Sequence, residues 1–199
     1  MAAYAAALVA TLPARVVAPR GSDASGTVWH GALGLADGAT AHWDWSAAQS
    51  LGSGAFAADW TLDGPGTMLT GVARLRPFGG AALTAVGGRA AWSLLAAYVP
   101  SLPPGCTIPL IVALDHVASS GTSGTVDSLP GSCPAAGALP RPVPRMIATF
   151  AGTSGIVTPW TDRATPYATV AVVGSTVHLH VTAAGAAVFG RAGDIEFGI

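Results

Sequence analysis

Short extended segments, each ended by a turn signal, fill most of this 199-residue chain and restrict it to a fold built from β-strands. Clusters of Gly, Pro, Ser and Asp recur about every 8–14 residues, which is the spacing of an antiparallel meander joined by hairpin-length connections. The segments predicted as strands are residues 26–35, 40–46, 54–62, 67–75, 81–87, 107–116, 124–129, 145–151, 155–161, 167–173 and 176–182, with weaker candidates at 186–190 and 194–197.

Two segments depart from this pattern. Residues 90–99 are rich in Ala and Leu, do not alternate and end before Pro100, so they predict one short helix. Residues 134–144 contain four prolines, which exclude a helix interior and a central strand and predict a connection. The predicted divisions are an apolar segment at 1–14, an N-terminal β lobe at 15–133, the Pro-rich connection at 134–144, and a C-terminal β lobe of the same domain at 145–199.

Large aromatic residues gather on one face of the predicted sheet. Side chains alternate between faces along a strand, so Trp43 and Trp45 share a face, as do Trp60 and Leu62. This face has two interpretations: tryptophans that pack the core, or a ligand or partner surface made by Trp43, Trp45 and Trp60.

Composition excludes several functional classes. Apolar residues make up 51% of the chain and charged residues 10%, a balance opposite to that of disordered proteins. The net charge is −1 and no basic cluster occurs, so the chain lacks the electrostatic signature of nucleic-acid binding. No Cys/His spacing typical of zinc and no phosphate-binding loop is present, so no metal or cofactor is predicted.

Catalytic residues are not predicted either. His42, Asp44 and Asp59 fall on the polar face, where a carboxylate pair would suit glycoside chemistry, but such faces carry these residues routinely. Asp115 and His116 resemble half of an acid–base unit, yet no G-x-S-x-G elbow or activated Cys signature accompanies them. His178 and His180 share one strand face with no Asp, Glu or Cys nearby in sequence, and we expect them to face solvent. The sequence therefore predicts a protein without enzymatic chemistry.

The two cysteines, Cys106 and Cys133, allow two interpretations: a disulfide or two buried thiols. Both lie in Pro- and Gly-rich loop contexts, whereas buried structural thiols usually lie inside strands or helices. The loop contexts favour the disulfide, which would imply an exported domain.

The apolar N-terminal segment also has two interpretations. Residues 2–12 are uncharged but shorter than the roughly 20 residues needed to span a bilayer. No basic residue precedes them, so they lack the start of a signal peptide. They predict either a buried or amphipathic helix that ends at Pro13, or the outer part of a membrane helix whose beginning is missing.

The order of motifs resembles that of the type II secretion system protein N family, also called general secretion pathway protein N. Its most specific element is Gly-Thr-Val-Trp-His-Gly at 26–31, which follows Leu-Pro-Ala at 12–14 at the distance seen in the family. The other motifs that carry the resemblance, which spans about residues 5–130, are Trp43 and Trp45, Gly54 with Trp60-Thr61-Leu62, Gly64-Pro65-Gly66 with Gly71, and the short helix before Pro100.

That resemblance implies a structural component of the machinery that exports folded proteins. It implies a single inner-membrane anchor at the N-terminus, a periplasmic β domain with a disulfide, and partners among the other secretion components. The curved sheets of this family are similar to those of the lipid-handling AsmA-like proteins. The expected fold is thus a mostly β, twisted and curved antiparallel meander, a half-barrel or groove, with one short helix and an N-terminal apolar helix. The alternative function is binding of a lipid or another apolar ligand in the groove.

Overall fold

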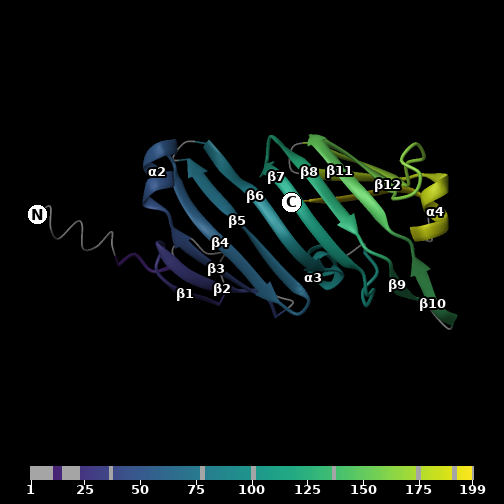
Figure 1. Ribbon diagram of the computed structural model, residues 1–199, viewed down its shortest axis with the longest axis horizontal. Coiled ribbons are helices and arrows are strands. Elements are labelled where there is room, and N and C mark those ends of the chain that lie inside the picture. Colours follow the sequence, from purple (N-terminus) through teal and green to yellow (C-terminus); the bar gives the residue numbers. More distant parts are fainter. Residues whose placement is uncertain are drawn as a thin grey trace, which may run out of the picture.

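A single antiparallel sheet of 13 strands dominates the structure (Figure 1). The computed structural model describes residues 11–14, 23–35, 38–76, 79–99, 102–135, 138–173, 176–189 and 192–198. The elements in chain order are β1 (Ala24–Gly26), β2 (His30–Gly34), β3 (Thr40–Trp45), α2 (Ala47–Ser53), β4 (Phe56–Gly64), β5 (Thr67–Arg76), β6 (Gly79–Ala91), α3 (Trp92–Tyr98), β7 (Pro109–Ala118), β8 (Gly121–Ser128), β9 (Gly131–Ala135), β10 (Ala138–Val143), β11 (Met146–Gly152), β12 (Ser154–Pro159), β13 (Ala168–Val173), β14 (Thr176–Val181), α4 (Ala183–Phe189) and β15 (Gly193–Gly198).

The strands pair in chain order, which confirms the predicted meander. The one exception is the β9–β10 hairpin, a separate two-stranded sheet inserted between β8 and β11, which pair directly with each other. The Pro-rich residues 134–144, predicted as an irregular connection, thus contribute to a hairpin. Strand pairing tolerates proline there because a two-stranded ribbon has only edge strands.

The sheet curls along its length and does not close into a barrel. Figure 1 shows the yellow C-terminal strands turning back behind the green central ones. Bulges contribute to this curl: the register shifts between Thr70 and Val72 and again between Leu114 and His116. Ala85 stands at one such irregularity with φ +52°. Extra residues of this kind bend a strand and increase its twist, so they give the meander a concave and a convex face.

The N-terminal motif forms a hairpin instead of the single strand predicted for residues 26–35. The turn between β1 and β2 is closed by a hydrogen bond from the Thr27 amide to the His30 carbonyl. The Thr27 hydroxyl also accepts hydrogen bonds from the backbone N–H groups of Trp29 and His30. Gly26 has φ +85°, a conformation that glycine adopts without the steric cost of a Cβ. The chain reversal within residues 26–31 was not predicted because its turn is held by a threonine hydroxyl, which is a weaker turn signal than Asn, Asp or Pro.

Three short helices occur in the described residues, where the sequence predicted one after the N-terminal segment. The helix predicted at 90–99 is confirmed as α3. The second, α2, was not predicted, and it ends at Gly54 in the left-handed conformation typical of a helix C-terminus. The third, α4, replaces the weak strand predicted at 186–190.

The predicted N-terminal helix is not supported. Residues 1–10 lie outside the described part, and in 11–14 Pro13 forms an isolated antiparallel bridge with Thr27. The Leu12 carbonyl accepts a hydrogen bond from the Val28 amide, so this short segment is held against the β1–β2 turn. Within the described residues, no helix has the length and apolar character needed to cross a bilayer.

Thr182 explains why α4 forms, and we expect Thr182→Ala to lower the free energy of unfolding by about 1–2 kcal/mol. Its hydroxyl accepts a hydrogen bond from the Gly185 amide in the first turn of the helix and donates to the Pro166 carbonyl. Chemical denaturation would measure the change. The control is Thr182→Ser, which keeps the hydroxyl and should lose less; equal losses in both variants would contradict a capping role.

Candidate functional site: an apolar groove

The concave face of the sheet encloses a groove of about 940 Å³. Its wall comes from one face of β6, β7, β8 and β11, and from β14 and β15 after the curl. At one end, Ile108, Leu110 and Met146 belong to the hydrophobic core and are almost fully buried. Helices α3 and α4 and the β9–β10 hairpin also contribute side chains to the lining. The volume lies near the top of the range of about 300–1,000 Å³ that is usual for ligand sites.

Strand alternation supplies the apolar lining. Leu110, Val112 and Leu114 follow one another at every second position of β7 and all line the groove. Across the curl, β14 contributes Leu179 and Val181 in the same way. Because inward positions repeat with a period of two, each strand adds a row of aliphatic side chains to one continuous surface.

Few polar groups interrupt this surface. Arg141, on β10, is the one charged side chain among the described residues that line the groove. Ser128, the last residue of β8, is 8% exposed, and its hydroxyl has no hydrogen-bond partner within the described part of the protein. The same holds for Nε1 of Trp60. Buried donors without partners are uncommon in folded proteins. Nε1 of Trp60 lies against Gly71, whereas the Ser128 hydroxyl indicates a place where a bound molecule or water would be stabilised.

The three predicted aromatic residues have different positions. Trp60 lines the groove. The Trp43 ring lies over Gly31 of β2, and its Nε1 donates to the Val28 carbonyl. Trp45 is 41% exposed and its ring packs edge-on against Trp29 at 4.9 Å. One of them therefore faces the groove, while the other two join the β1–β2 hairpin to the sheet.

The polar residues predicted on the opposite face lie close together. Asp44 of β3 is directly opposite His30 of β2 on one side and Asp59 of β4 on the other. The Gln49 side chain of α2 donates a hydrogen bond to Asp59 at 3.1 Å. His42 lies one pleat further along β3, opposite Thr61. The two carboxylates are thus cross-strand neighbours.

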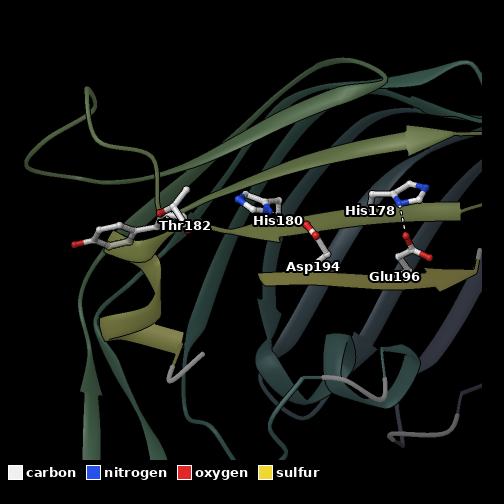
Figure 2. Close-up of polar contacts among 6 residues, drawn as sticks. His178, His180, Thr182, Asp194 and Glu196 are labelled. Carbon is white, nitrogen blue, oxygen red and sulfur yellow. Dashed lines mark hydrogen bonds and ion pairs between the residues drawn. The ribbon is translucent and has the colours of Figure 1, made fainter. Parts of the chain in front are cut away.

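His178 and His180 have carboxylate partners that the sequence analysis missed. Nδ1 of His178 lies 3.0 Å from Oε1 of Glu196, and Nδ1 of His180 lies 2.6 Å from Oδ1 of Asp194 (Figure 2). Both pairs are solvent-exposed and join β14 to β15. The sequence did contain a signal for these pairs: Asp194 and Glu196 alternate with apolar residues, as His178 and His180 do, and pairing the two segments as strands places the charges opposite the histidines. In the described residues no group of three His, Cys, Asp or Glu side chains is arranged to hold a metal.

A smaller hollow of about 360 Å³ lies elsewhere on the sheet, at the ends of β5, β6 and β7. Arg74, Arg76 and His116 line it together with Ser119. The predicted partner of His116, Asp115, stands at the bulge in β7 and does not line this hollow. Arg76 and His116 are 40 positions apart in the sequence, and their strands β5 and β7 are brought together because both pair with β6.

The loop after β12 is held by Asp162, and we expect this carboxyl group to titrate below its ordinary pKa of 3.8. Hydrogen bonds from the Thr165 hydroxyl and the Ala164 amide lower its pKa. A lowered pKa in the folded state stabilises the loop fully above pH 3.8, and this stabilisation is lost as the pH falls through the folded-state value. An NMR titration of the Ala164 amide would show the midpoint, and Asp162→Asn should abolish it. A midpoint above 3.8 would contradict this prediction.

Comparison with known proteins gives no match: no protein-family model, no curated protein and no solved structure matches this chain.

Proposed function

We propose that the protein is an accessory structural component of the type II secretion machinery, with its β domain in the periplasm and an N-terminal anchor in the inner membrane. The observation that carries this proposal is the Gly-Thr-Val-Trp-His-Gly hexapeptide together with the curled sheet that follows it. Each part of that motif has a structural role in the β1–β2 hairpin. The proposed action is protein–protein contact without chemistry of its own, and the exposed Trp45 is a contact candidate because aromatic residues are enriched at interfaces.

Deletion of the gene followed by measurement of secreted enzyme tests this proposal. We expect extracellular activity of a type II substrate to fall while its periplasmic level rises, and a plasmid copy to restore export. A photo-crosslinking amino acid at position 45 should capture another secretion component. The control is position 173, because Val173 is 64% exposed and lies on distant β13. Unimpaired secretion and equal crosslinking from both positions would contradict the proposal.

The second candidate function is the binding of an apolar ligand, and the groove favours it. A space of about 940 Å³ lined by aliphatic side chains would gain roughly 25 cal/mol for each Å² of apolar ligand surface removed from water. Most of its wall comes from one continuous hydrogen-bonded sheet, so a ligand would need little reordering of the protein.

Native mass spectrometry of the purified protein tests the second candidate. We expect co-purified lipid with the wild type and its loss with Val112→Trp, which would fill the groove from the middle of β7. The control is Ile111→Trp, since Ile111 precedes Val112 on the same strand and is absent from the lining. Retention of the ligand by Val112→Trp, or its loss from both variants, would contradict binding in the groove.

A further inference from the structure

We propose that the groove holds an acyl chain in one orientation, with the anionic head of the amphiphile at the β9–β10 end, where Arg141 binds it. This inference rests on the second candidate function and adds the class of ligand and its direction. Two features carry it: the position of the polar groups in the lining, and the absence of hydrogen-bonding side chains along the rest of the central rows.

Three rows of inward-facing residues cross the centre of the groove, and they differ in polarity. The first row joins Leu110, Ser128 and Met146 on β7, β8 and β11. The next two rows are Val112, Val126 and Ala148, and then Leu114, Gly124 and Phe150. Among these three rows, only the first contains a polar side chain, and it lies at the end where β8 leads into β9.

Arg141 lies at the same end as this first row. It pairs with Cys133 across the β9–β10 hairpin, and both line the groove. Ser128 precedes the hairpin by three residues. Arg141 is solvent-exposed, and no carboxylate in the described part of the chain forms an ion pair with it. A guanidinium at the rim of an otherwise apolar groove suits a carboxylate or a phosphate, since both accept charge-assisted hydrogen bonds from arginine.

The lining selects a hydrocarbon over a peptide. A peptide laid along the rows of Val112 and Leu114 would bury backbone N–H and C=O groups with no side-chain partner. Each such group would cost about 1–3 kcal/mol. An acyl chain carries no such groups along its length. Its head would need partners only at one end, where the unpartnered Ser128 hydroxyl and Arg141 lie.

Titration of three probes by native mass spectrometry tests this orientation. The probes are oleate, dioleoyl phosphatidylglycerol and the neutral oleyl alcohol, each added to protein stripped of lipid. Arg141→Gln should weaken binding of the anionic probes about tenfold, which corresponds to the loss of one charge-assisted hydrogen bond, and leave oleyl alcohol unchanged. The control is Arg163→Gln, which removes an exposed arginine that is not in the lining.

The outcomes separate the inference from the function on which it rests. If Arg141→Gln weakens the binding of oleate alone tenfold, the ligand class is a fatty acid. If it weakens the binding of the phospholipid, the ligand class is a membrane lipid. Both results support the orientation. Equal binding of all three probes to wild type and Arg141→Gln would overturn the orientation while leaving the groove a binding site. Failure of the wild type to bind any probe would overturn both.

Ser128→Ala should weaken binding without lowering the free energy of unfolding, because its hydroxyl has no partner in the ligand-free protein.

Discussion

Substitution of Gly31 by alanine should lower the free energy of unfolding by about 1–3 kcal/mol, the usual range for an overfilled, well-packed site. A Cβ at this position would lie 2.5 Å from Cζ2 of Trp43 and 2.6 Å from the carbonyl oxygen of Ser25. Neither neighbour has an easy escape, since the Trp43 ring is fixed by its hydrogen bond to Val28 and the Ser25 carbonyl belongs to β1. Urea denaturation followed by tryptophan fluorescence would measure the loss.

Gly34→Ala is the matched control for this substitution. Gly34 lies on the same strand, and a Cβ there would have its nearest neighbour at 3.7 Å, an ordinary contact. We expect its free energy of unfolding to change by no more than about 0.5 kcal/mol. A double-mutant cycle with Trp43→Ala then separates the two contacts, because removal of the ring should recover part of the cost of Gly31→Ala. Strict additivity of the two substitutions would show that the ring is not the cause.

The role of Gly31 explains why the N-terminal hexapeptide is so restricted in residue type. Gly31 gives the Trp43 ring its place, Thr27 supplies the hydroxyl that closes the turn, and Trp29 packs on Trp45. These contacts join the first hairpin to β3 and so begin the sheet. The motif is therefore a structural element by its geometry, which is consistent with the proposed absence of chemistry in this region.

The strands were predictable because both of their signals are local. Alternation along 40–46 or 176–182 and the Gly- and Pro-containing turns between strands depend on neighbouring residues, and the pairing in chain order follows from short connections. The short helices α2 and α4 were not predicted because they lack a strong local signal. Seven residues are too few to form a stable helix by intrinsic propensity, so these helices depend on contacts with the sheet and on caps such as Thr182.

The groove was not predictable in detail because it depends on how the sheet curls. The strand predicted at 107–116 is nearly continuous in Ile, Leu and Val, so its sequence does not distinguish inward from outward positions, whereas only inward ones such as Leu110 and Val112 line the groove. The conspicuous tryptophans drew attention to β3 and β4, yet most of the lining is aliphatic and comes from later strands. Leu179 of β14 lines the same groove as these residues because the sheet curls, and no local sequence pattern specifies an approach between residues so far apart in the chain.

The Cys106–Cys133 disulfide is confirmed, and its removal should have the largest effect on stability. The sulfur atoms are 2.03 Å apart and the cysteines are separated by 27 positions. The chain-entropy model assigns a bond closing a loop of 27 residues about 3.5 kcal/mol, because the crosslink reduces the freedom of the unfolded chain. We therefore expect the Cys106→Ala, Cys133→Ala double variant to unfold at lower urea concentration, by this difference in free energy.

The bond also fixes the polar end of the groove. It joins the segment before β7 to β9, next to the bridge between Thr107 and Ser132, and Cys133 lies opposite Arg141 on the hairpin. Reduction of the wild type should reproduce the loss of stability seen in the double variant and should leave that variant unchanged. It should also weaken binding of an anionic probe, since a looser hairpin holds Arg141 less firmly against the groove. A wild type that is equally stable with and without reductant would contradict the assigned contribution. Because such bonds persist only in an oxidising compartment, the same measurement tests whether the fold depends on export from the cytoplasm.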